Sequence, residues 1–168
     1  MMRVFLAFWP DDAMLGRLEA ARHRLFPLSG RAVEAADLHL TAAFLGSVEP
    51  ARLDALRALC GSVAAGVLKL DRAEHWPKSA ALVAAASQTP PELTRCIDDL
   101  WRRLDRLGFA RETRPYRPHV TLARDVPSVR PSLKWTTVEW PLGRIGLFES
   151  RPGGHAPRYL DISGRNIS

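Results

Sequence analysis

Two copies of one short pattern constrain the fold of this 168-residue chain more than any other feature of its sequence. His39-Leu40-Thr41 and His119-Val120-Thr121 both read His-x-Thr, and they lie 80 residues apart, close to half the length of the chain. Each copy follows the same order of elements: a strand, a helix, and a second strand that carries the motif. An internal duplication of this length predicts two similar lobes that share one core, within a single domain over residues 1–168.

Apolar periodicity predicts the elements of this repeat. In the first half we expect strands over Met2 to Trp9, Leu38 to Leu45 and Val67 to Leu70, the first with Phe5, Ala7 and Trp9 on one face. A helix capped by Asp11 or Asp12 is expected between the first two strands, with an inward stripe of Met14, Leu18, Ala21 and Leu25. A second helix is expected from Pro50, with an inward stripe of Leu53, Leu56, Cys60 and Val63. In the second half we expect strands over Ala80 to Ala86, Pro118 to Ala123, Thr136 to Trp140, Ile145 to Glu149 and Tyr159 to Ile162, and a helix from Pro91 that ends at Gly108.

The His-x-Thr pattern itself suggests chemistry. A strand projects residues i and i+2 to the same face, so each His is expected beside its Thr. A single such His is more often a hydrogen-bonded core residue, whereas two copies at matching places of a repeat favour one shared site. Imidazoles can act as base and acid near neutral pH, and hydroxyls can donate to phosphate oxygens. The pair therefore suits in-line attack at phosphorus, with His39 and His119 facing each other across a cleft.

Four stretches of the chain resemble the 2H phosphoesterases, specifically the bacterial RNA 2′,3′-cyclic phosphodiesterases, also called 2′-5′ RNA ligases or LigT-like proteins. They are LHLTAAFLG and RPYRPHVTLAR around the two motifs, MRVFLAFWP near the N-terminus and LFESR near the C-terminus. The resemblance implies an α+β fold of two pseudo-symmetric lobes, in which antiparallel-rich sheets line a central cleft and helices lie outside. The chain departs from the family pattern at Ala42, at Ala43 and at Ser79-Ala80-Ala81, which affects details of substrate contact and of the cleft rim.

The resemblance also implies a reaction that needs no metal and no cofactor, and that opens a 2′,3′-cyclic phosphate on an RNA end or a small nucleotide to a 2′-phosphate. By this analogy His119 activates water, His39 protonates the leaving 3′ oxygen, and Thr41 and Thr121 hold the phosphoryl oxygens. The two motifs are nearly symmetric, so the sequence does not itself rank acid and base. Two alternatives stay open: joining of 2′-5′ RNA ends through the same site, and a non-catalytic RNA- or nucleotide-binding module, against which the two intact motifs argue.

Further residues around the motifs have two interpretations each. Arg124 matches a basic position of the motif and could bind phosphate, yet strict alternation puts it on the face opposite His119 unless the strand ends or bulges there. Arg114 and Arg117 could contact a nucleotide backbone, although exposed loop arginines are more often solvated or paired. Tyr116 and Phe44 could stack a base, but Phe44 shares the face of Leu40 and is expected in the core.

The remaining histidines and tryptophans are given structural interpretations. His23 is expected on a helix away from its apolar stripe, and His75 and His155 in loops, so we expect all three at the surface. Trp76, Trp135 and Trp140 are expected to be packing anchors rather than a platform for bases.

Composition limits the cell compartment and the partner. The chain carries 24 Lys and Arg against 18 Asp and Glu, and 21 of the basic residues are Arg, whose planar fork suits phosphate, although genome composition could produce the same bias. Cys60 and Cys96 suggest neither a zinc site nor a redox pair. We expect no export signal, and the sequence has no apolar run of the roughly 18 residues that a membrane span needs. We expect a cytoplasmic monomer that binds no membrane.

Overall fold

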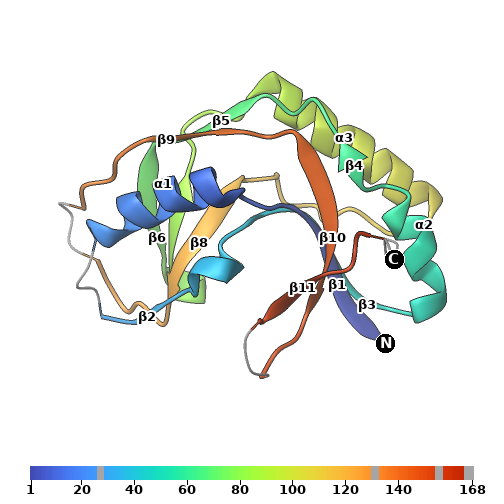
Figure 1. Cartoon of the computed structure of the whole chain (residues 1–168), viewed down its shortest axis with the longest axis horizontal. Coiled ribbons are helices and arrows are strands. Elements are labelled where there is room, and N and C mark those ends of the chain that lie inside the picture. Colours follow the sequence, from blue (N-terminus) through green and yellow to red (C-terminus); the bar gives the residue numbers. More distant parts are fainter. Residues whose placement is uncertain (26–28, 130–132, 154–156, 165–168) are drawn as a thin grey trace.

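Antiparallel pairing organises every sheet of the computed structural model, which describes residues 1–25, 29–129, 133–153 and 157–164 (Figure 1). The strands are β1 (Met2–Phe8), β2 (Arg31–Ala32), β3 (Leu40–Val48), β4 (Gly61–Ser62), β5 (Val67–Leu70), β6 (Arg72–Trp76), β7 (Ala81–Ala85), β8 (His119–Arg124), β9 (Val138–Pro141), β10 (Arg144–Ser150) and β11 (Tyr159–Asp161). The helices are α1 (Asp12–His23), α2 (Leu53–Arg57) and α3 (Pro91–Arg106), with 3-10 turns η1 (Ala35–Asp37), η2 (Pro50–Arg52) and η3 (Pro77–Ser79).

The two motif strands belong to different sheets. The first sheet has the order β11-β10-β1-β3, with β4 beside β10, and the second has the order β2-β8-β7-β6; β5 and β9 form a separate pair. In each large sheet the strand that opens a repeat, β1 or β7, pairs directly with the motif strand, β3 or β8. The expected repeat is therefore visible in the strand pairing, and the fold is α+β with antiparallel sheets.

Local sequence explains the first strand and helix. Val4 through Phe8 are all buried, as expected for a strand with neighbours on both edges and apolar residues on both faces. At the start of α1, the Asp11 side chain accepts a hydrogen bond from the Met14 amide at 2.7 Å, which is the expected cap. The predicted inward stripe of α1 is buried. These expectations are confirmed.

The second half follows its pattern equally well. Pro91 occupies the first turn of α3, and the apolar stripe from Leu93 to Leu104 is buried. Gly108 ends the helix with φ of +82°, a left-handed conformation that glycine adopts without strain. One continuous cluster of buried residues includes Leu6 and Leu40 of the first sheet and Leu122 of the second, so both sheets contribute to the same core.

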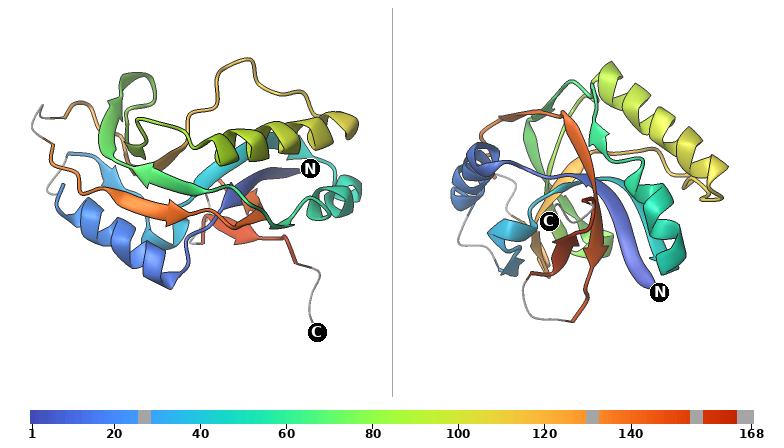
Figure 2. Two further views of the ribbon diagram at one scale, coloured as in Figure 1. Left: turned by 90° about the horizontal axis from the view of Figure 1, so that it is seen from above. Right: turned by 45° about the vertical axis from the view of Figure 1, so that its right-hand side comes forward.

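The helices pack across the repeat. Helix α1 follows β1 but contacts β9 and reaches β8 through Arg22, whereas α3 follows β7 but contacts β3 of the first sheet. Figures 1 and 2 show α1 and α3 on opposite sides of the molecule. Within the described residues, no helix has the length and apolarity needed to cross a bilayer.

Three expectations were wrong in detail. Strand β3 begins at Leu40, so His39 lies in the short segment between η1 and β3 rather than within the strand. The helix expected from Pro50 is a 3-10 turn followed by the five-residue α2, and Cys60 and Val63 lie beyond its end, half-buried. Strand β6 occupies a stretch expected to be a loop, because its residues lack apolar alternation and the strand forms by pairing with β7.

Candidate active site

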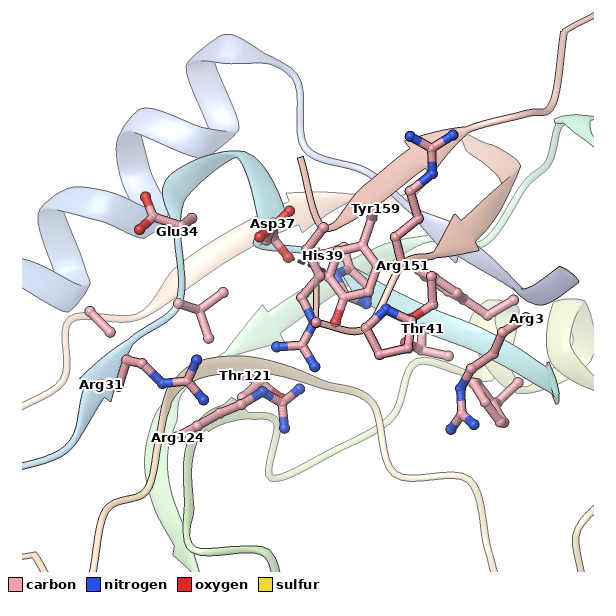
Figure 3. Close-up of a pocket in the computed structure, with 18 of the residues that line it drawn as sticks. Arg3, Arg31, Glu34, Asp37, His39, Thr41, Thr121, Arg124, Arg151 and Tyr159 are labelled. Atoms are coloured by element: carbon pink, nitrogen blue, oxygen red, sulfur yellow. Dashed lines mark hydrogen bonds between the residues drawn. The ribbon is translucent and has the colours of Figure 1, made fainter. Parts of the chain in front are cut away.

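A cavity of about 980 Å³ brings together all five residues that the sequence singled out. It lies where β3 and β8 approach each other, and its lining includes His39, Thr41, His119, Thr121 and Arg124. Figure 3 shows His39, Thr41, Thr121 and Arg124 converging on one space from the two motif strands and the turn before β3. The duplicated pattern therefore forms one site at the junction of the two sheets.

His39 is held by backbone and enclosed by aromatic rings. Its Nδ1 lies 2.7 Å from the carbonyl oxygen of Asp37 in the η1 turn. The imidazole stacks parallel to Trp9, with ring centroids 4.8 Å apart, and contacts Phe5 at 5.1 Å and Tyr159 at 4.9 Å. Burial among these rings disfavours the charged form and lowers the pKa of His39 to about 4.

His119 has the same anchor and a different wall. Its Nδ1 lies 2.8 Å from the carbonyl oxygen of Arg117, again two residues before the imidazole. The ring contacts one aromatic residue, Trp76, at 4.4 Å and an angle of 52°. Burial lowers the pKa of His119, and the nearby positive charges of Arg117 and Arg124 act in the same direction, whereas the carboxylate of Glu74 raises it.

The shared anchor fixes the tautomer of both imidazoles. A carbonyl oxygen can only accept a hydrogen bond, so Nδ1 carries the proton in His39 and in His119. Each Nε2 is then the nitrogen that can take a proton from a ligand or deliver one to it. Two such nitrogens, with the hydroxyls of Thr41 and Thr121, make the cavity suited to general acid–base chemistry on a phosphate ester.

Arg124 reaches the cavity because β8 contains a bulge. Thr121 pairs with Val83 and Ala123 pairs with Leu82, so Leu122 is an extra residue in β8. The extra residue shifts the alternation by one position and places Arg124 on the face of Thr121. The positive charge of Arg124 lowers the pKa of both His39 and His119, so it acts on both imidazoles. Of the two interpretations given for Arg124, the bulged one is confirmed.

The same bulge occurs in β3 and overturns the expectation for Phe44. Thr41 pairs with Ala7 and Ala43 pairs with Leu6, so Ala42 is the extra residue. Phe44 therefore turns to the face of Thr41, where it lines the cavity and is 42% exposed instead of lying in the core. In the repeat, Phe44 occupies the place that Arg124 has in β8. The buried side chains of Ala42 and Ala43 face away from the cavity.

Positive charge dominates the cavity walls. Five arginines and two carboxylates line it: Arg3, Arg31, Arg124, Arg151 and Arg158, with Glu34 and Asp37. Arg31 is paired with Asp125 at 3.2 Å and Arg151 with Glu149 at 3.1 Å. Arg3 lies 4.8 Å from the centre of the Phe44 ring. In Figure 3, Arg31 and Arg124 lie to one side of His39 and Arg3 and Arg151 to the other, so guanidinium groups lie at both ends of the cavity.

Sequence reasoning missed three residues of the His39 wall. Asp37 is 6% exposed, and burial raises the pKa of its carboxyl, while Arg158 and the backbone N–H of Tyr159 lower it. Tyr159 comes from β11, which lies outside the two-copy repeat and so had no matching motif. Trp9 could have been found, because the alternation of β1 already placed it on the face of Phe5.

The two loop arginines before His119 are engaged elsewhere. Arg117 donates to Glu74 at 2.9 Å and lies 5.0 Å from the centre of the Trp76 ring. Arg114 pairs with Glu112 at 3.0 Å. Neither belongs to the cavity lining, and the paired interpretation is confirmed.

Trp76 and Tyr116 also have defined partners. Trp76 donates its Nε1–H to Glu74 at 2.9 Å and packs against His119, so it is more than the packing anchor that we expected. Tyr116 donates its hydroxyl to the carbonyl oxygen of Thr41 at 2.9 Å and does not line the cavity, so it does not stack a base there.

The other histidines and tryptophans give mixed outcomes. His23 is exposed, as expected, and His155 lies outside the described residues. His75 was wrongly placed at the surface: it is half-buried in β6 with Nε2 2.7 Å from the carbonyl oxygen of Val126. Trp135 donates to Leu70 O at 2.8 Å and Trp140 is buried, which confirms both as packing anchors.

Metal and thiol chemistry have no prepared site in the part of the chain that the structure describes. There, no group of three or more His, Cys, Asp or Glu side chains is arranged to hold a metal ion. Cys60 and Cys96 are both free and half-buried, and burial raises the pKa of each thiol.

Comparisons with known proteins find similar sequences and a similar fold. A model of the 2′-5′ RNA ligase superfamily matches residues 10–154. An Escherichia coli RNA 2′,3′-cyclic phosphodiesterase is 38% identical over 101 residues, which are 59% of this chain and 57% of that protein. An Archaeoglobus fulgidus RNA 2′,3′-cyclic phosphodiesterase is 30% identical over 128 residues, which are 73% of this chain and 72% of that protein. The crystal structure of E. coli LigT complexed with 3′-AMP superposes with a TM-score of 0.77 at 28% identity, covering 96% of this chain and 95% of that one.

Proposed function

Because the chain belongs to the 2′-5′ RNA ligase superfamily, we propose that it hydrolyses the 2′,3′-cyclic phosphate of an RNA end or a small nucleotide to a 2′-phosphomonoester. One observation carries the proposal: two imidazoles with the same anchored tautomer line a single cationic cavity, each beside a threonine of its own motif. Two curated relatives, each covering between half and three-quarters of this chain, are named for this activity.

The proposed reaction needs one proton acceptor and one donor on opposite sides of phosphorus. Water attacks the phosphorus and gives a proton to Nε2 of His119, the bond from phosphorus to the 3′ oxygen breaks, and that oxygen receives a proton from Nε2 of His39. The assignment of base and acid follows the family resemblance. The hydroxyls of Thr41 and Thr121 donate to the non-bridging phosphoryl oxygens as negative charge builds on them.

Arg124 and Phe44 give the cavity two different ends for one nucleotide. The guanidinium of Arg124 acts on both imidazoles and can donate to the phosphate in a charge-assisted hydrogen bond. The exposed ring of Phe44 offers a face on which a nucleobase can stack. We therefore place the base toward β3 and the phosphate between the motifs, beside β8.

The test is direct. The purified protein is incubated with the four nucleoside 2′,3′-cyclic phosphates and with an oligonucleotide that ends in a cyclic phosphate, and the product isomer is identified. Hydrolysis to the 2′-phosphomonoester supports the proposal. Production of the 3′ isomer, or no turnover by a folded protein that binds the nucleotide, contradicts it.

Joining of 2′-5′ ends is the second candidate function. The specific observation in its favour is that arginines lie at both ends of the cavity. There they could bind the backbone phosphates of the two RNA segments that flank the reacting phosphate. Incubating a cyclic-ended oligonucleotide with a 5′-hydroxyl oligonucleotide tests it, because ligation alone produces a longer chain. Cytoplasmic location and a monomeric state stay predictions, and light scattering in solution tests the second.

A further inference from the structure

We propose that Arg22 and Tyr116 are positioning residues, each of which fixes the bulge of one motif strand from the opposite half of the chain. Arg22 belongs to the first repeat and holds β8, whereas Tyr116 belongs to the second and holds β3. Through the bulges they aim Arg124 and Phe44 into the cavity. The inference rests on the proposed function in one respect, that Arg124 and Phe44 contact substrate.

Arg22 is a buried cation whose donors point at backbone. It is 6% exposed, at the end of α1, where its guanidinium pairs with Glu19. Its Nη1 donates to the carbonyl oxygen of Val33 and, at 3.2 Å, to that of Leu122, the extra residue of the β8 bulge. Burying a charged group is costly unless its hydrogen bonds are made, so this arginine holds these carbonyls firmly.

The Leu122 carbonyl is therefore held twice. Besides Arg22, it accepts the backbone N–H of Val33 at 3.0 Å, which follows the short β2 strand. Strand β2 has two residues and pairs with Arg124 and Ala123 immediately beyond the bulge. Such a short strand gives little stability of its own. Arg22 ties its end to the bulge and keeps the extra residue at Leu122.

Tyr116 makes the corresponding contact in the other half. Its ring packs against the common core and its hydroxyl donates to the carbonyl oxygen of Thr41 at 2.9 Å, directly before the extra residue Ala42. Among the described residues, β3 is the last strand of its sheet, so no further described strand pairs with its outer edge. Burial raises the pKa of Tyr116, so the hydroxyl stays protonated and remains a donor.

The position of a bulge decides which side chains reach the cavity. The side-chain period of a strand is two, so moving the extra residue past Arg124 would return that side chain to the opposite face. The same holds for Phe44 in β3. A hydrogen bond to the carbonyl at the bulge, made from outside the sheet, opposes such a shift. The contacts join residues 100 and 75 positions apart, so each lobe sets the geometry of the other.

Double-mutant cycles test this coupling with a 2′,3′-cyclic nucleotide as substrate. Arg124→Ala is expected to raise KM at least about 10-fold, the loss of a charge-assisted hydrogen bond. Arg22→Met, which keeps length and loses the donors, is expected to raise KM by a similar factor in the parent protein and by less than about 2-fold in the Arg124→Ala background. Likewise, Tyr116→Phe is expected to raise KM in the parent protein and to change KM by less than about 2-fold in the Phe44→Ala background.

The crossed pairs and one helix variant are the controls. The fold-changes in KM caused by Arg22→Met and Phe44→Ala should multiply in the double variant, because the two residues belong to independent bulges. The same holds for Tyr116→Phe combined with Arg124→Ala. Arg24→Met, which removes an exposed arginine bonded to Thr136 at the C-cap of the same helix, should leave KM unchanged. If Arg22→Met prevents folding, Arg22→Lys keeps the charge with fewer donors, and the Val33 amide should then exchange its hydrogen faster.

The possible failures are distinct. If Arg124→Ala leaves KM unchanged, the proposed role of Arg124 fails. If Arg124→Ala raises KM but Arg22→Met or Arg22→Lys lowers kcat/KM by the same factor in both backgrounds, Arg22 serves general stability and the positioning inference is overturned. Unchanged exchange of the Val33 amide in Arg22→Lys would also overturn it.

Discussion

The two imidazoles of the site share a backbone anchor and differ in everything around it. His39 and His119 both donate from Nδ1 to the carbonyl two residues before them. His39 is then enclosed by three aromatic rings contributed by β1, by the segment after it and by β11. His119 contacts Trp76 and lies near the ion pair between Glu74 and Arg117.

This difference shows which features of the site the two copies of the repeat share and which features differ between them. The anchor, the adjacent threonine and the bulge occur at matching positions of the two motif strands, so both copies have them. The walls come from residues outside the motifs and differ, so three aromatic rings enclose His39, whereas the Glu74–Arg117 ion pair lies beside His119. The two nearly identical motifs therefore place their imidazoles in different electrostatic surroundings: burial lowers the pKa of both, and at His119 the Glu74 carboxylate opposes it.

Removing either imidazole should have the largest effect on the rate. General acid and base contributions are each about 10² to 10⁴ in rate, so His39→Ala and His119→Ala should each lose at least that factor in kcat while remaining folded. The double variant should lose less than the product of the two, because the groups act as a unit. His23→Ala, which changes an exposed histidine outside the cavity, is the control. A His119→Ala variant with near-full turnover would refute the two-histidine mechanism.

A bound anion should raise the pKa of His39. Burial holds the pKa of His39 at about 4, so His39 can donate a proton at neutral pH only if a bound phosphate raises that value. An opposite charge within about 4 to 6 Å favours the charged form by about 1 to 3 pH units. NMR titration of the imidazole signals with and without inorganic phosphate measures the change.

The outcome of that titration decides the roles. A pKa rise confined to His39 supports His39 as acid. A rise confined to His119 would reverse the assignment of acid and base taken from the family resemblance. His23 provides the unaffected reference signal, since it is exposed and outside the cavity.

Stability in acid should depend more on His39 than on His119. The folded-state pKa of His39 lies below its unfolded value near 6.5, so the unfolded chain binds the proton first. Above pH 6.5 the imidazole is neutral in both states, so its burial adds no pH dependence to the free energy of unfolding. As the pH drops from 6.5 toward 4, this free energy falls by at most about 1.4 kcal/mol per pH unit. For His119 the Glu74 carboxylate opposes the effect of burial.

Urea unfolding at pH 7 and pH 4.5 measures this difference. His39→Gln should reduce the loss of unfolding free energy between the two pH values by about 2 kcal/mol. His119→Gln, the matched variant, should reduce it by less. Equal reductions would mean that the aromatic wall does not distinguish the two imidazoles.

How far the sequence predicts this molecule depends on whether the signal is local. Strand β1, helix α1 and helix α3 were predicted because their apolar periods are complete within each element. The pairing of His39 with His119 was predicted because the same tripeptide occurs twice in a repeat. Strand β6 was missed because only its pairing with β7 makes it a strand.

The bulges show the limit most clearly. Strict alternation put Phe44 in the core and Arg124 on the opposite face, and the extra residue that precedes each of them, Ala42 in β3 and Leu122 in β8, reverses both placements. Arg22 and Tyr116, the residues that contact those bulges, are distant in sequence from the motif strands that they contact, so no local sequence pattern predicts these contacts. Tyr159 was missed for a related reason, since β11 belongs to neither copy of the repeat.

The smallest expected effect concerns the charged wall of His119. Glu74 raises the pKa of His119, so Glu74→Gln should lower it and move the corresponding limb of the pH–rate profile to lower pH by a few tenths of a unit, as expected for one partly solvated charge. The amide oxygen can still accept from Trp76, so the ring stays in place and kcat at the optimum should change little.

Glu112→Gln is the matched control, because Glu112 forms a similar exposed pair with Arg114 away from the cavity. It should leave both limbs in place. If Glu74→Gln moves the limb to higher pH, or if Glu112→Gln moves it equally, the carboxylate beside Trp76 does not set the acidity of His119. The contrast with the apolar wall of His39 would then rest on burial alone.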